Sequence, residues 1–102
     1  MSCAVAGERL RRALGRSADM AACGVTFASE ISHSWSSNSF IGGRHEFELL
    51  VSGPEARAWL NGLDENGVNV PGHVVVALDV ASVEQQGERL AASIEALTIE
   101  EA

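Results

Sequence analysis

The side chains of this 102-residue chain that could support catalysis or bind a metal are its histidines, its cysteines and a pair of glutamates. His33, His45 and His73 are scattered, and Glu48, three residues after His45, would lie on the opposite face of a strand, where the two side chains could not converge on a metal. Cys3 and Cys23 form no Cys-x-x-Cys pair and are interpreted as free thiols. Because structural zinc needs four clustered nitrogen or sulfur ligands, we expect no metal site and no cofactor.

Nucleophilic catalysis finds little support either. The hydroxyl-rich segment 29–39 contains His33, but nothing in the sequence activates a particular serine, and no Gly-x-Ser-x-Gly motif is present. Gly42 and Gly43 are not followed by a phosphate-binding pattern, so we interpret them as a bulge or turn. We therefore expect no enzyme activity, which would require a carboxylate or histidine with a perturbed pKa in a cleft.

Glu46 and Glu48 lie in the clearest strand of the sequence, residues 41–53. Side chains alternate faces along a strand, so these two glutamates share one face with Arg44 and stand about 7 Å apart. Paired carboxylates at that spacing suit acid–base chemistry, but a solvated strand face is the simpler interpretation. The opposite, apolar side of the strand carries His45, Phe47, Leu49 and Val51.

A helix is predicted directly after this strand, over residues 54–63. Ser52 and Glu55 have the spacing of a capping box, with Pro54 in the first turn. The expected buried stripe of the helix consists of Ala56, Trp59, Leu60 and Leu63.

An earlier helix is predicted over residues 3–15, ending at Gly15. Arg9, Arg12 and Arg16 fall near one face of it. They are either a docking surface or a solvated face with cations near the helix C-terminus.

Residues 24–35 are predicted to be an extended strand interrupted by small polar residues, which indicate either a bulge or exposure toward the end of the strand. Val25, Phe27, Ile31 and Trp35 share one parity. Trp35, at the start of a Ser/Asn-rich loop, fits a contact anchor and a core residue equally well.

The C-terminal third contains a strong strand and an ambiguous segment. The nearly continuous apolar run at 74–80 predicts a strand buried on both faces, in the middle of a sheet. Residues 89–99 match a helical period slightly better than a strand period, and their alanines favour helix. The short turn-like link at 85–88 is nevertheless typical of a hairpin.

The net charge of the chain and its distribution make some classes of function less plausible than others. The length predicts one domain over residues 1–102, and the net charge is −7. From residue 17 onward there are 13 acidic residues against three arginines, a balance that repels a phosphate backbone. No apolar run approaches the length of a membrane span. These features argue against nucleic-acid binding as the main function and against membrane insertion.

The segment 34–53 resembles the tail-completion or tail-terminator proteins of long-tailed phages and of alphaproteobacterial gene transfer agents. The resemblance rests on the polar loop at Trp35-Ser36, the strand with Gly42, Gly43, Arg44 and His45, and the later strand Gly72-His-Val-Val-Val-Ala-Leu78. It ends at Ala96-Leu-Thr98 and covers the chain from about residue 25 onward, with a leading helix.

This resemblance implies an α+β fold in the order α-β-β-α-β-β, with a mixed or antiparallel four-stranded sheet, and it makes residues 89–99 a strand. It implies a structural protein that forms a ring, commonly a hexamer, on the tail tube of a virion or gene transfer agent particle after synthesis in the bacterial cytoplasm. Its partners would be further copies of itself, the tail tube protein and the head connector, with DNA passing through the lumen without specific binding. The expected contact residues are Arg9, Arg12, Trp35, Arg44, Glu46 and Glu48.

Two alternatives remain open on the residues themselves. One is a small dimeric α+β module that binds a ligand or partner and has no role in a virion. It predicts a stable dimer with an apolar pocket, whereas the ring predicts head-to-tail contacts. The other is a small enzyme.

Overall fold

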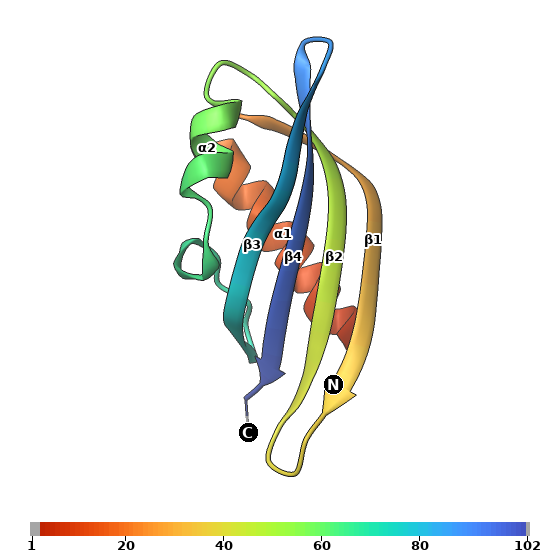
Figure 1. Cartoon of the computed structure of the whole chain (residues 1–102). Coiled ribbons are helices and arrows are strands. Elements are labelled where there is room, and N and C mark those ends of the chain that lie inside the picture. The colour runs from red at the N-terminus through yellow and green to blue at the C-terminus, as the bar shows by residue number, and fades with distance from the viewer. Residues whose placement is uncertain (1–2, 102) are drawn as a thin grey trace.

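The chain forms a four-stranded antiparallel sheet with its helices packed on one face. The computed structural model describes residues 3–101. The strand order is β1-β2-β4-β3, and α1 crosses the sheet while α2 lies beside β3 (Figure 1). The predicted α+β class and the order α-β-β-α-β-β are confirmed. The elements are α1 (Cys3–Met20), β1 (Gly24–Ser36), β2 (Ile41–Ser52), α2 (Ala56–Gly62), the 3-10 turn η1 (Glu65–Gly67), β3 (His73–Gln86) and β4 (Arg89–Glu100).

Helix α1 is longer than predicted. It continues through Gly15 to Met20, because Leu10, Leu14 and Ala18 extend its buried stripe by a further turn against the sheet. Ala22 then adopts a left-handed conformation with φ 61°, which lets the amide of Cys23 bond to the carbonyl of Ala18 at 2.9 Å. This bond satisfies a helix carbonyl in the manner of a glycine C-cap.

Strand β2 alternates as predicted, and β4 supplies the second half of the core. The alternation in β4 buries every second residue, so residues 89–99 are a strand, as the resemblance implies and against the local helical preference. The fully buried aromatic and aliphatic side chains on the two strands are Phe47, Leu49, Val51 and Ile94.

A bulge in β1 changes which face its later residues occupy. The register shifts between Phe27 and Ser29, so Phe27 packs toward the core while Ile31 and Trp35 point to the other side of the sheet. The predicted bulge is present, and it divides residues that share one parity in the sequence between two faces.

The prediction that residues 74–80 form a central strand is wrong. Strand β3 lies at the edge of the sheet, and Val74 and Val76 are each nearly half exposed. Register shifts near Val76 and Ala81 break the edge in two places, as in edge strands that resist pairing with other chains.

The predicted capping box of α2 is also absent. The helix begins at Ala56, and Glu55 occupies the N-cap position without a side-chain hydrogen bond to the helix amides. The chain reaches this point through Gly53, whose φ of 110° turns the backbone away from β2. The expected buried stripe is nevertheless present at Ala56, Trp59 and Leu60, and Trp59 Nε1 donates to Ser17 Oγ of α1 at 2.9 Å.

Candidate interaction surface

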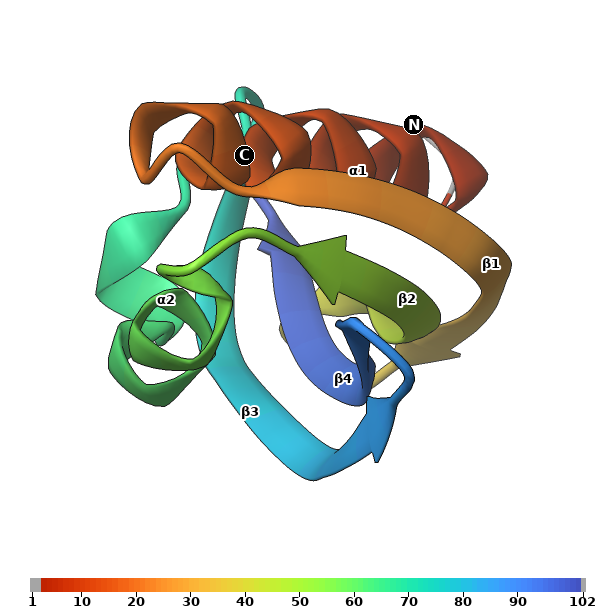
Figure 2. The same ribbon diagram turned by 90° about the horizontal axis from the view of Figure 1, so that it is seen from above.

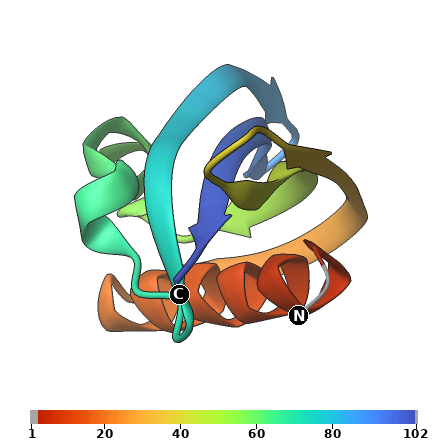
Figure 3. The same cartoon turned by 90° about the horizontal axis from the view of Figure 1, so that it is seen from below.

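No helix of residues 3–101 covers one of the two faces of the sheet. The end views show α1 on one side of the curved sheet (Figures 2 and 3), and the strand registers identify the side chains on the other side. We call this surface the helix-free face. Its central residues are Ile31 and His33 of β1, Arg44, Glu46 and Glu48 of β2, Ala77 and Asp79 of β3, and Ser93, Glu95 and Leu97 of β4.

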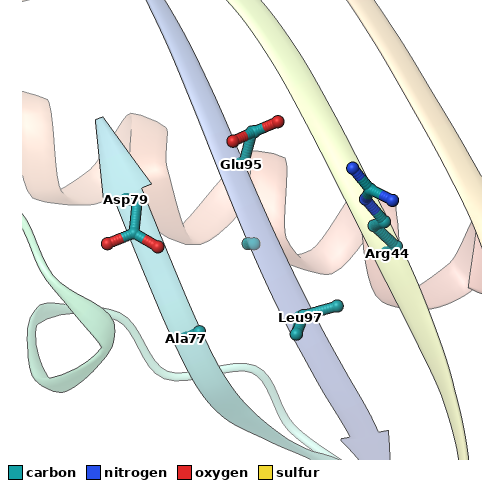
Figure 4. A pocket seen from close by; sticks show the side chains of 6 residues that line it. Arg44, Ala77, Asp79, Glu95 and Leu97 are labelled. Carbon is teal, nitrogen blue, oxygen red and sulfur yellow. The ribbon is translucent and has the colours of Figure 1, made fainter. Parts of the chain in front are cut away.

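Three carboxylates form a row across the middle of this face. Glu95 of β4 is the direct cross-strand partner of Asp79 on one side and of Glu46 on the other. Figure 4 shows Asp79 and Glu95 on their neighbouring strands. Like charges directly opposite each other destabilise a sheet, so this acidic row opposes folding of the isolated chain. It is the arrangement on this face that most requires a functional explanation.

Arg44 lies one row away from these acids. It borders a hollow of about 290 Å³ together with Asp79, Glu95, Leu97 and Ala77. Within residues 3–101 its guanidinium makes no ion pair. The hollow has carboxylates on one side and an apolar floor, so it suits the methylene stem and cationic head of an incoming arginine or lysine.

Glu46 and Glu48 share the helix-free face but do not form a joint acid–base pair. A carboxylate oxygen of Glu46 lies 3.9 Å from His33 Nε2. Glu48 is the direct cross-strand partner of Ser93, whose hydroxyl donates its proton to the Glu48 carboxylate, with oxygen–oxygen distances of 2.7 and 2.8 Å. Each carboxylate therefore has its own neighbour, as on a solvated strand face.

The predicted arginines of α1 lie on a different surface, on the outer side of the helix layer. Arg9, Arg12 and Arg16 surround a hollow of about 270 Å³ with Pro71. Arg9 donates to the carbonyl of Pro71 at 2.7 Å, and Arg12 pairs with Glu8 at 2.8 Å. Arg16 makes no ion pair with the described residues. We call these three residues the arginine stripe.

Trp35 does not belong to the buried core, and its role as a contact anchor stays a prediction. It is half-buried at the end of the helix-free face, where its ring covers Gly42; a Cβ on that glycine would lie 2.7 Å from Cζ2 of the tryptophan. The indole Nε1 is buried and has no hydrogen-bond partner among the described residues. Val74 and Ile99 continue this row across β3 and β4, so one end of the face is apolar.

Sequence reasoning missed a buried polar network beneath α1. His45 is fully buried; its Nδ1 lies 2.8 Å from Ser32 Oγ and its Nε2 lies 2.9 Å from Thr98 Oγ1. The Thr98 hydroxyl donates to the carbonyl of Gly43 at 3.4 Å, so His45 Nε2–H donates to Thr98 and Nδ1 accepts from Ser32. Burial, and secondarily the proximity of His73, lower the pKa of His45. The feature of the sequence that could have predicted this network is the position of His45 on the apolar side of its strand, where a polar side chain needs buried hydrogen-bond partners.

A cavity of about 180 Å³ adjoins this network. It is bordered by Cys3 and Ala6 of α1, by Gly43 and Thr98, and by His73, whose buried Nε2 has no partner among the described residues. Across residues 3–101, no three histidine, cysteine or acidic side chains are arranged to hold a metal ion. The thiol of Cys23 is buried, and this burial raises its pKa, which keeps the sulfur protonated and unreactive.

No family model, curated protein or solved structure matches this chain. Among the helices of residues 3–101, none combines the length and apolar character required to cross a membrane.

Proposed function

We propose that this chain is a structural protein whose copies assemble head to tail into a ring that caps the tail tube of a phage or gene transfer agent particle. The observation that carries the proposal is the presence of two surfaces of opposite charge on one small domain. The arginine stripe lies on the helix layer, and the acidic row lies on the helix-free face. Two different complementary surfaces on one chain are what a heterologous, ring-closing contact requires.

Two further features support the tail-terminator role. The order α-β-β-α-β-β agrees with the fold that the resemblance implies. The net charge of −7 also suits a ring around a DNA passage, because an acidic lumen repels phosphates and lets DNA slide without binding. In this role the ring stops growth of the tube and presents a surface to the head connector.

Electron microscopy of particles from a strain lacking the gene tests this function. We expect tails of abnormal length or tails without heads, and restoration of normal particles when the gene is supplied on a plasmid. Normal particles in the deletion strain would refute the terminator role.

A small binding module is the second candidate, and the cavity beneath α1 is the observation that favours it. His73 lines this cavity, and its buried Nε2 has no partner within the described chain. Such a module would form a symmetric dimer that does not grow further. Light scattering after size-exclusion chromatography separates the candidates, since a dimer at every concentration supports the module and a larger closed assembly supports the ring.

A further inference from the structure

We propose that α1 of one copy lies across the helix-free face of the next copy, with its arginine stripe on the acidic row. This inference rests on the proposed function for its head-to-tail ring, and it names the two surfaces that meet. The three cations are Arg9, Arg12 and Arg16, and the three anions are Glu46, Glu95 and Asp79.

The two sets of charges have matching lengths. Neighbouring strands are about 4.8 Å apart, so three carboxylates on three adjacent strands span about 9.6 Å. A helix rises about 1.5 Å per residue, so the stripe from Arg9 to Arg16 spans about 10.5 Å. A helix laid across the strands, at right angles to them, therefore places one arginine near each carboxylate.

The contact would relieve an electrostatic penalty present in the single copy. The carboxylate of Glu95 stands between two other carboxylates, and no ion pair within residues 3–101 includes it or Asp79. Arginine forms bidentate bonds with carboxylates and keeps its charge in an interface. Seating the stripe on the row replaces repulsion between strands by attraction between copies.

Exposed apolar side chains beside the acidic row can contact the long side chains of arginines. Leu97 is 38% exposed and Ile31 is 50% exposed, and both lie on the helix-free face beside the acidic row. The methylene stems of arginines can cover these apolar side chains while their guanidinium groups reach the acids. The contact would thus bury apolar surface as well as pair charges.

The partner that binds the helix-free face is a second copy of this chain, because the same chain carries both complementary surfaces. Each copy offers its stripe to one neighbour and its face to another, so the contact repeats from copy to copy and forms a ring when the rotation between neighbours closes. The masses of charge-reversed variants test this arrangement. One variant, Arg12→Glu with Arg16→Glu, reverses two of the three stripe charges and leaves Arg9 with its bond to Pro71. The other, Asp79→Lys with Glu95→Lys, reverses most of the row.

Both variants should fold, which circular dichroism would verify. The second variant has one like-charge pair in the row, Lys beside Lys, where the natural chain has two. A control with Arg57→Glu and Arg89→Glu makes the same change in net charge as the Arg12→Glu, Arg16→Glu variant, at exposed positions on α2 and at the start of β4.

We expect the natural chain and the control to assemble, and each reversed variant alone to associate at least about tenfold more weakly. An equimolar mixture of the two reversed variants should assemble again, because each reversed surface then meets its complement. Assembly by either variant alone at the natural concentration, or a mixture that stays monomeric, would overturn the contact. A natural chain that is monomeric at all concentrations would overturn it as well.

These outcomes separate the contact from the function. If the reversed variants assemble normally while the deletion strain makes aberrant tails, the ring function stands and this pair of surfaces is wrong. If the contact is verified while the deletion strain makes normal particles, the chain self-assembles for another purpose.

Discussion

His45 on β2 and Thr98 on β4 are joined beneath α1 by a hydrogen bond of 2.9 Å between Nε2 and Oγ1. Both side chains are fully buried, and Ser32 of β1 bonds to the other ring nitrogen. The network therefore ties three adjacent strands together on the core side of the sheet. A neutral ring satisfies these bonds, whereas a charged ring would be desolvated and close to His73, which is why the pKa of His45 is lowered.

This lowered pKa predicts a loss of stability in acid. Below about pH 6.5 the unfolded chain binds a proton at His45 that the folded chain does not bind, so the free energy of unfolding falls as pH falls. The loss continues down to the folded pKa, at no more than about 1.4 kcal/mol per pH unit. We expect His45→Gln to be less stable than the natural chain near neutral pH, and to lose less stability on acidification.

Urea unfolding from about pH 7.5 to about pH 5 measures this difference, because the pH range covers the titration of histidine. The stability gap between the two proteins should narrow as pH decreases. His33→Gln is the matched control, since His33 is exposed on the helix-free face. Parallel pH profiles for the natural chain and His45→Gln would show that His45 does not titrate as described.

Two glycines of α1 should respond in opposite ways to alanine. Replacing a helical glycine by alanine gains about 1 kcal/mol from helix propensity. At Gly15, apart from the adjacent residues and the nearby backbone of α1, no described atom lies within 4 Å of the added Cβ, so Gly15→Ala should stabilise the protein. At Gly7 the Cβ would lie 2.5 Å from Ser32 Oγ and 3.3 Å from His45 Nδ1. Gly7→Ala should break their hydrogen bond and destabilise the protein, and equal melting temperatures for the two variants would contradict this packing.

Ala22 provides a third test, at the end of α1. A left-handed conformation costs a non-glycine residue roughly 1–2 kcal/mol, and Ala22 holds φ 61° on the surface. Ala22→Gly should raise the free energy of unfolding, by less than that cost because glycine also loosens the unfolded chain. Ala58→Gly, at an exposed position within α2, should lower it. Chemical denaturation compares them, and a loss of stability in both would rule out strain at Ala22.

The sequence predicted the elements better than their places in the sheet. The apolar run at 74–80 predicts a central strand, yet β3 is at the edge, and Val74 and the bulged Val76 are nearly half exposed. Burial on both faces depends on which strand pairs with which, and strand order is a tertiary property. In β4 the residues fit helical and strand periods alike, and the hairpin at Gly87, with φ 62°, selects the strand.

The acidic row could not be predicted for the same reason. Glu46 was expected on a polar strand face, and that expectation is confirmed. Asp79 and Glu95 lie more than 30 positions further along the chain, and only the pairing registers bring them beside Glu46. Trp35 and Arg44 lie on this face as well. The bulge in β1 places Trp35 there, on the opposite face from Phe27, although the alternation in the sequence predicts the same face for both.

Glu95→Gln should change stability and assembly in opposite directions. Removing the middle carboxylate relieves repulsion with Asp79 and Glu46, so the single copy should gain about 0.2–1 kcal/mol of stability. The gain should shrink at high salt, where charges are screened.

If the acidic row receives the arginine stripe, the same substitution removes an anion from the contact and weakens association. Glu88→Gln, in the β3–β4 turn, makes the same change in charge outside the row. Thermal unfolding and analytical ultracentrifugation at low and high salt measure both effects, and a Glu95→Gln protein less stable than Glu88→Gln at low salt would show that the row is not repulsive.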